Sequence, residues 1–183
     1  MFESILRAPD AVRIDGAEAQ RIPAEGTRFI LKDIAVETRE ASGVLQVGLT
    51  AAETPVSRVT LRWHFAARLK GQVLGDTWER AYGDLEWKHV TPWQTLPWYA
   101  LVNRGEETVG YGVMTQPGAV CAWQIDPEGI TLKLDVRCGG EGVLLRGRTL
   151  RAAAVVCENY EGMSAFAAAR AFCRRMCPEP LLP

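Results

Sequence analysis

The sequence lacks the short motifs that mark the common catalytic chemistries. No G-x-S-x-G, G-x-x-x-x-G-K-[ST], G-x-G-x-x-G or H-E-x-x-H occurs in its 183 residues. Histidine is scarce, with only His64 and His89, so a metal site would have to be built mainly from carboxylates. We therefore predict no metal and no cofactor for this chain.

Neither sign of charge dominates, and long apolar runs are missing. The 21 basic and 22 acidic residues leave a net charge of −1, without the basic footprint of a nucleic-acid-binding protein. The longest uncharged apolar run is far short of a membrane span. Glu3, Arg7 and Asp10 interrupt any signal-peptide apolar region. The sequence thus predicts a cytoplasmic protein with no nucleic-acid or membrane partner.

Cysteine pairs with metal or redox spacing are also missing. The chain has five cysteines and no C-x-x-C. An odd count without that spacing favours reduced, mostly buried thiols over a disulfide framework. Cys173 and Cys177 are expected to share a helix face, but two thiols alone make a poor zinc site.

Short apolar segments with β-forming residues recur about every ten residues, separated by Gly, Pro or Asp. Residues 28–36 are rich in β-formers, and residues 98–103 and 108–114 predict a hairpin. Residues 56–65 alternate, which places Trp63 on the apolar face and His64 on the polar face of a half-buried strand. We interpret Trp123 as core or as a contact with another domain. The spacing predicts an all-β antiparallel sandwich over residues 1–160.

One helix is predicted, near the end of the chain. Ser164 is a good N-cap, and residues 165–176 follow with helical periodicity. The expected apolar stripe consists of Phe166, Ala169, Cys173 and Met176. Prolines at 178 and 180 end the helix. Residues 161–183 therefore read as a linker helix and the start of a connection to a further domain.

The stretch 75–99 is the least suited to simple core packing. It holds four of the six tryptophans, interleaved with carboxylates, arginine and proline. Aromatic faces beside polar groups suit a sugar-binding surface, although a protein interface or a packed loop needs similar residues. The carboxylates at 76, 79, 84 and 86 are candidates for a glycosidic acid pair. Surface ion pairs with the nearby Arg80, Lys88 and His89 are the favoured interpretation.

Several segments, in this order, are similar to a known family. They are residues 75–87, 97–99, 110–113, 123–126, 134–140 and 171–178. Together they resemble the N-terminal region of α-galactosidase-like (melibiase-like) proteins of the glycoside hydrolase family 36 type. The resemblance spans about residues 75–183, whereas the earlier residues match only in strand character.

The resemblance implies an antiparallel β-supersandwich of the galactose mutarotase-like kind, then a linker helix, then a (β/α)8 barrel. The catalytic aspartates of that family lie on the barrel, and no position of this chain matches their motifs. What the resemblance implies here is an accessory sugar contact. Asp84 would accept sugar hydroxyls and Trp78 or Trp87 would stack on a sugar face, with Arg80 and Tyr82 as further candidates.

Three hypotheses about function follow. The leading one is a non-catalytic β-sandwich domain of an α-galactosidase-like glycosidase, which shapes the substrate entrance, packs on the barrel and contributes to homo-oligomers. The second is a free-standing carbohydrate-binding module. The third is a mutarotase-like enzyme, for which only His64 and His89 could supply a histidine base.

Overall fold

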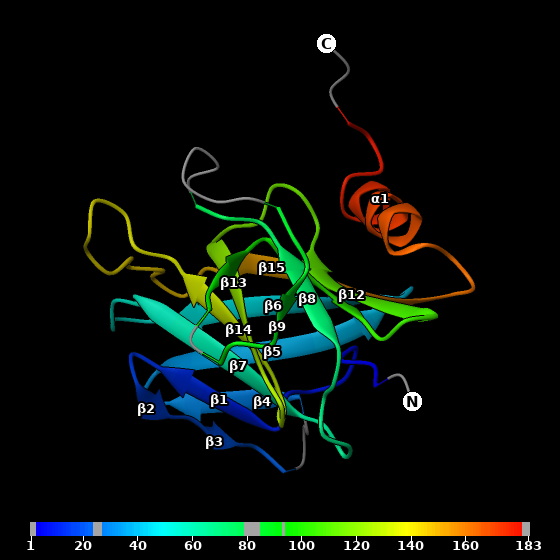
Figure 1. Ribbon diagram of the computed structural model, residues 1–183. Helices are drawn as coiled ribbons and strands as arrows, with labels where there is room; N and C mark the ends of the chain where they lie inside the picture. Colours follow the sequence, from blue (N-terminus) through cyan, green and yellow to red (C-terminus); the bar gives the residue numbers. More distant parts are fainter. Residues whose placement is uncertain (1–2, 24–26, 79–84, 93, 181–183) are drawn as a thin grey trace.

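The computed structural model describes residues 3–23, 27–78, 85–92 and 94–180. In this part of the chain the strands form two antiparallel sheets, a small one and a large one (Figure 1). In spatial order, the small sheet consists of β10 (Leu96–Pro97), β13 (Val120–Asp126), β14 (Gly129–Asp135), β7 (Arg58–His64), β1 (Ala11–Ile14) and β2 (Ala17–Glu18).

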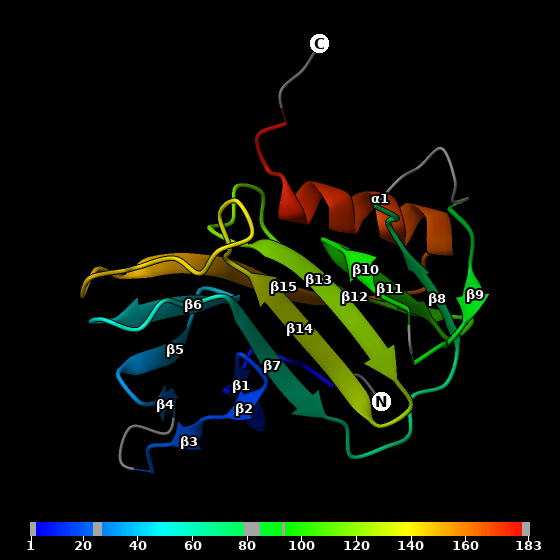
Figure 2. The same cartoon turned by 90° about the vertical axis from the view of Figure 1, so that its left-hand side faces the viewer.

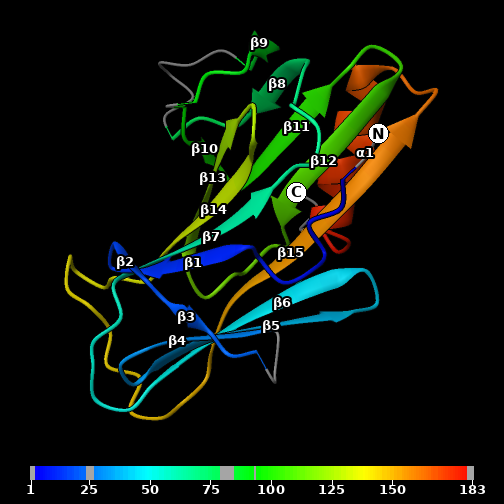
Figure 3. The same ribbon diagram turned by 90° about the horizontal axis from the view of Figure 1, so that it is seen from below.

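The large sheet lies against the small one and completes the sandwich. In spatial order it consists of β3 (Gln20–Arg21), β4 (Arg28–Leu31), β5 (Ile34–Ala41), β6 (Val44–Ala51), β15 (Leu150–Glu161), β12 (Glu107–Val113), β11 (Tyr99–Asn103), β8 (Gln72–Gly75) and β9 (Lys88–His89). The long β15 pairs with β6 through its first half and with β12 through its second half (Figure 3). The predicted all-β sandwich with a C-terminal helix is confirmed.

The core lies between the sheets and is centred on two tryptophans. Trp63 and Trp123 are both fully buried, and their ring centroids are 6.5 Å apart. Each indole N–H donates to a backbone carbonyl at 3.0 Å, Trp63 to Arg7 and Trp123 to Trp98. A buried indole needs such a partner, because an unpaired N–H in an apolar core is costly. Trp63 is core as predicted, and Trp123 is core rather than a contact with another domain.

Trp98 joins the two sheets. It stands between β10 of the small sheet and β11 of the large sheet, with a φ of 67° that bulky residues rarely adopt. Its N–H donates to Cys121 of β13, and its carbonyl accepts from Val113 of β12 as well as from the Trp123 indole. These bonds to both sheets hold the backbone in this conformation.

The segment 28–36 is not one strand. The chain reverses at Lys32, where φ is 58°, so that Leu31 of β4 lies opposite Ile34 of β5. The Asp33 carboxylate fixes this turn by accepting hydrogen bonds from the backbone N–H groups of Glu53 and Thr54, at 2.7 and 3.0 Å. Apolar composition alone did not reveal the break, because neither turn residue is Gly or Pro.

The helix α1 (Ala165–Met176) has its predicted bounds, and the Ser164 side chain accepts from the N–H of Ala167 at 3.2 Å. It packs on the outer face of the large sheet, beside β12 and β15 (Figure 2). The predicted apolar stripe is wrong in part. Phe172, Ala168 and Met176 are buried, whereas Phe166 is 76% exposed and Cys173 is also exposed.

The strand β12 decides which face of α1 is buried. A Cβ atom added at Gly110 would lie 2.4 Å from the Phe172 ring, and one added at Gly112 would lie 2.5 Å from the Met176 sulfur. The two glycines therefore leave the slot that Phe172 and Met176 fill. Helical periodicity identified an amphipathic helix, but it could not identify this slot in a distant strand.

The cysteines are less buried than predicted. Cys121 and Cys157 are buried, Cys177 is half-buried, and Cys138 and Cys173 are exposed; all are free thiols. Burial raises the pKa of both Cys121 and Cys157 to about 12, which suppresses thiolate chemistry there. No helix in the described ranges is long and apolar enough to cross a bilayer. Cytoplasmic location stays a prediction.

Candidate functional site

The structure describes two of the predicted sugar-contact residues and separates them. Trp78 is 56% exposed and borders a hollow on the outer face of the small sheet, beside β7, β13 and β14. Trp87 is half-buried and packs against the apolar cluster beneath α1, on the other side of the sandwich. The remaining candidates, Arg80, Tyr82 and Asp84, lie outside the described residues. Trp78 and Trp87 thus do not face one ligand.

Three neighbouring hollows lie along the outer face of the small sheet, with volumes of about 310, 670 and 260 Å³. Thr60 lines all three, Arg13 lines the first and second, and Arg58 lines the second and third. Shared walls make them one surface, which we call the outer-face groove. The first two volumes lie within the usual range for small-ligand sites, about 300–1,000 Å³, and the third lies just below it.

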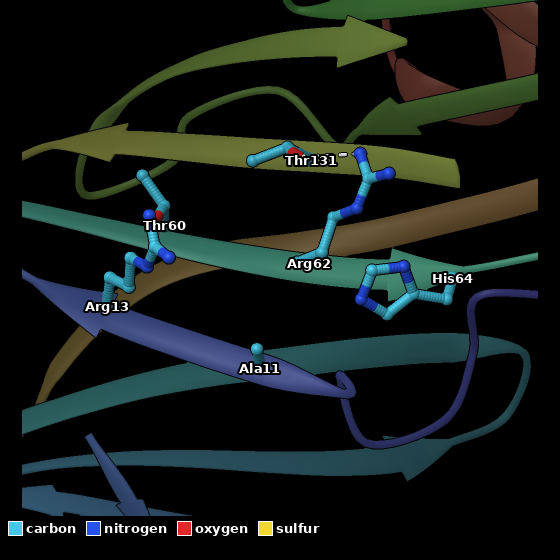
Figure 4. Close-up of a pocket in the computed structure, with 6 residues that line it drawn as sticks. All are labelled: Ala11, Arg13, Thr60, Arg62, His64 and Thr131. Atoms are coloured by element: carbon cyan, nitrogen blue, oxygen red, sulfur yellow. Dashed lines mark hydrogen bonds between the residues drawn. The ribbon is translucent and has the colours of Figure 1, made fainter. Parts of the chain in front are cut away.

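The groove follows from the alternation of the central strands. In β7 the residues Val59, Leu61 and Trp63 face the core, so their neighbours Arg58, Thr60, Arg62 and His64 face outward. Strand register then sets out rows across the sheet. One row runs Arg13–Thr60–Lys133–Ala122 and the next runs Ala11–Arg62–Thr131–Gln124. Figure 4 shows the part of these rows that surrounds the first hollow, with Arg13, Thr60, Ala11, Arg62 and Thr131.

One carboxylate beside the groove is held by an arginine. The Arg62 guanidinium binds both Asp126 oxygens, at 2.6 and 2.8 Å, and donates to the Thr131 hydroxyl at 3.2 Å. Burial would raise the pKa of Asp126, but the hydrogen bonds from Arg62 and from the Glu128 N–H outweigh it and lower the pKa. Asp126 is therefore ionised, and both of its carboxylate oxygens are bound by Arg62.

The second carboxylate of this face is held by two arginines. Arg137 donates to Asp135 through Nη2 at 2.6 Å and through Nε at 2.9 Å, and Arg58 Nε lies 3.4 Å from the same carboxylate. These hydrogen bonds, Arg137 foremost, lower the pKa of Asp135 to about 2. Both carboxylates thus stay charged well into the acid range, and their oxygens are largely occupied.

Two cations of the groove differ from the others. Within the described residues, the side chains of Arg13 and Lys133 make no hydrogen bond and no ion pair. Glu18 lies opposite Arg13 across the β1–β2 pair, yet the two form no ion pair. Arg13 is exposed and Lys133 is half-buried. They are two cations of this face that remain free to bind a ligand.

The two histidines lie on different sheets. His64 is exposed at the end of β7 and lines the hollow of about 310 Å³, whereas His89 is exposed on β9 at the edge of the large sheet. The Asp10 carboxylate accepts a hydrogen bond from the backbone N–H of His64 at 2.7 Å and forms an ion pair with Arg7. In the part of the chain that the structure describes, no carboxylate shares the lining of the hollow beside His64. No group of three or more potential metal ligands gathers in the described ranges.

A further hollow of about 360 Å³ lies between the end of β12 and the C-terminal end of α1. Its lining is mostly apolar and includes Trp98, Val113, Met114, Pro117 and Met176. Trp98 is 38% exposed there. This surface suits a contact with another apolar surface more than it suits a polar ligand.

The sequence indicated the polar face of β7 but not its neighbours. Alternation places Arg58, Thr60 and Arg62 outward, but the sequence predicted no binding role for them. Arg13 and Lys133 were not singled out, because they are 120 positions apart in the chain. Comparisons with known proteins found no matching family model and no matching curated protein.

Proposed function

We propose that this chain is the non-catalytic N-terminal β-sandwich domain of an α-galactosidase-like glycoside hydrolase. It shapes the substrate entrance and packs on a (β/α)8 barrel that follows in the parent protein. The observation that carries the proposal is Trp78, more than half exposed at the border of a groove lined by arginine, lysine and threonine side chains. An exposed indole beside convergent polar groups suits a sugar ring, which offers an apolar face and hydroxyl edges.

The electrostatics of the groove support a role in binding rather than in catalysis. Glycosidases use a carboxyl pair in which the general acid has a raised pKa, so that it still holds its proton near neutral pH. Here the pKa values of Asp126 and Asp135 are both lowered by their arginine partners. Neither carboxyl can serve as the acid. In the proposed enzyme the hydrolytic residues are those of the barrel, as the family resemblance implies.

The hollow at the C-terminal end of α1 supports the proposed packing on a barrel. Its apolar lining would be buried by a domain that continues from the helix, which would remove Trp98 and Met114 from water. The sandwich would then hold the following domain through α1 and through the end of β12.

Activity assays test the assignment directly. We expect the chain joined to its genomic downstream sequence to hydrolyse p-nitrophenyl α-galactoside, and the isolated chain to show no hydrolysis above background. A catalytically dead version of the joined polypeptide, with the barrel aspartates replaced, controls for contaminating activity. Hydrolysis by the isolated chain would contradict the non-catalytic role, and an inactive, folded joined polypeptide would contradict the enzyme class.

The alternative is a free-standing carbohydrate-binding module that uses the same groove. In that case the isolated chain binds galactosides in calorimetry, and Trp78→Ala weakens binding about three- to tenfold, from roughly 0.5–1.5 kcal/mol of aromatic contact. Trp87→Ala is the matched control, because Trp87 packs beneath α1 and should leave the affinity unchanged. Equal losses in both variants, or no heat with any glycan, would contradict this alternative.

A mutarotase-like activity has less support. It needs a general base with an acid partner at the sugar ring. His64 does line a hollow, but no carboxylate among the described residues lines the hollow with it, and His89 lies on the other sheet.

A further inference from the structure

We propose that the sugar bound in the outer-face groove is anionic, with a carboxylate, sulfate or phosphate group held between Arg13 and Lys133 above Thr60. This inference rests on the proposed carbohydrate contact and adds the chemical class of the ligand. Three features of the groove support it: the position of these two cations, their lack of ion pairs among the described residues, and the arginine partners of the nearby carboxylates.

The register places the two cations on either side of one hydroxyl. Arg13 of β1 lies opposite Thr60 of β7, and Thr60 lies opposite Lys133 of β14. Neighbouring strands are about 4.8 Å apart, so the Cα atoms of Arg13 and Lys133 are separated by roughly 10 Å. Figure 4 shows the Arg13 guanidinium reaching toward Thr60. Two long side chains at this spacing can meet on one small anion, and the Thr60 hydroxyl can donate to it.

The charges of the groove are unbalanced, although those of the whole chain are nearly balanced. Five permanent cations line it: Arg13, Arg58, Arg62, Lys133 and Arg137. Among the described residues, the carboxylates in the lining are Asp15 and Asp135; Asp126 beside it is bound to Arg62, and Glu18 lies opposite Arg13 on the neighbouring strand. The net charge of the chain is −1. A local excess of positive charge at a hollow raises the concentration of anions there.

Two carboxylates of this face, Asp126 and Asp135, are already bound by arginines, whereas Glu18, opposite Arg13 in the register, makes no ion pair with it. A neutral sugar is commonly held by carboxylates that accept its hydroxyl protons, but Asp126 and Asp135 accept from arginines. Asp15 accepts from the backbone N–H of Arg58 at 2.8 Å. What the groove still offers is donors: the Arg13 guanidinium, the Lys133 ammonium and the hydroxyls of Thr60 and Ser57. Among the described lining residues cationic donors predominate, which matches an anionic group, since charge-assisted hydrogen bonds are the stronger ones.

Calorimetry with matched sugars tests the inference. The probes are methyl α-galactoside, galacturonate, galactose 6-sulfate and galactose 6-phosphate, with inorganic phosphate and sulfate as sugar-free controls. We expect at least one anionic sugar to bind the folded chain about tenfold or more tightly than the neutral galactoside, with an affinity that falls as salt is raised. The carboxylate, sulfate and phosphate arms identify which anion the groove accepts.

Charge-removing variants locate the site. We expect Arg13→Gln and Lys133→Gln each to weaken the anionic sugar about tenfold, and to change the affinity for the neutral galactoside less than twofold. Lys133→Met keeps the apolar stem of the half-buried side chain and should behave like Lys133→Gln. Arg39→Gln is the control. Arg39 is exposed on β5 of the large sheet, so this substitution removes one positive charge away from the groove. Thermal melting confirms that each variant is folded.

Different results would overturn different claims. Equal affinity for neutral and anionic sugars, unchanged by the variants, overturns the anionic ligand and leaves the carbohydrate contact standing. Inorganic phosphate or sulfate that binds as tightly as its sugar ester overturns the saccharide part. If no sugar binds, the proposed carbohydrate contact is wrong as well. Hydrolysis by the joined polypeptide then tests the domain assignment independently.

Discussion

Replacing Phe172 by alanine should lower the free energy of unfolding by about 3–5 kcal/mol, the usual cost of emptying a large aromatic site in a core. Phe172 is fully buried, and its ring fills the slot left by Gly110 and Gly112 on β12. A rigid strand with two glycines cannot close over the cavity, so little of the cost is recovered. Urea unfolding of both proteins, followed by far-UV circular dichroism, measures the difference.

Phe166→Ala is the matched control for this experiment. It removes the same side chain from the same helix, but Phe166 is 76% exposed, so the expected change is within about 0.5 kcal/mol. The result also bears on the domain organisation, because a helix that depends on Phe172 is part of the sandwich and not a loose linker. A large loss for Phe166 and a small one for Phe172 would mean that α1 packs through the other face.

The second large effect is expected at Trp123. Trp123→Ala should cost about 3–5 kcal/mol, because the indole is fully buried against Trp63 at the centre of the core. Trp123→Phe should cost less, about 1–2 kcal/mol, through lost volume and the lost hydrogen bond to the Trp98 carbonyl. That carbonyl keeps the N–H of Val113 as a donor at 3.2 Å, so it is not left unpaired.

Trp78→Ala is the control for Trp123→Ala. Because Trp78 is 56% exposed, this substitution should change the free energy of unfolding by no more than about 0.5 kcal/mol. Urea unfolding again provides the free energies, and near-UV circular dichroism reports whether the remaining tryptophans stay ordered. Equal costs for Trp123→Phe and Trp123→Ala would show that the hydrogen bond, and not the buried volume, holds the indole in place.

The strands and the helix were predictable because their signals are local. The alternation in residues 56–65 identified β7 and the inward position of Trp63, and Ser164 with the following periodicity gave the bounds of α1. The errors arose where a distant element decides the outcome. The turn at Lys32 is held by hydrogen bonds that the Asp33 carboxylate accepts from the N–H groups of Glu53 and Thr54, about 20 residues further on. The buried face of α1 depends on two glycines of β12.

The candidate site was only half predictable, for the same reason. Composition drew attention to the tryptophan-rich stretch, and Trp78 does border the groove. Trp87, nine positions later, packs on the opposite side of the sandwich. The other residues of the site lie on β1, β7 and β14, for whose outward side chains the sequence predicted no binding role.

The sequence by itself determined an all-β sandwich, the inward face of its central strand and the position of its single predicted helix. Each of these follows from side-chain periodicity within a dozen neighbouring residues. Only the tertiary structure decided that Arg13, Thr60 and Lys133 form one row, that Arg62 and Arg137 occupy the nearby carboxylates, and that Trp78 and Trp87 face apart. Strand register and sheet order are pairings between distant segments, and periodicity within a segment carries no information about its partner.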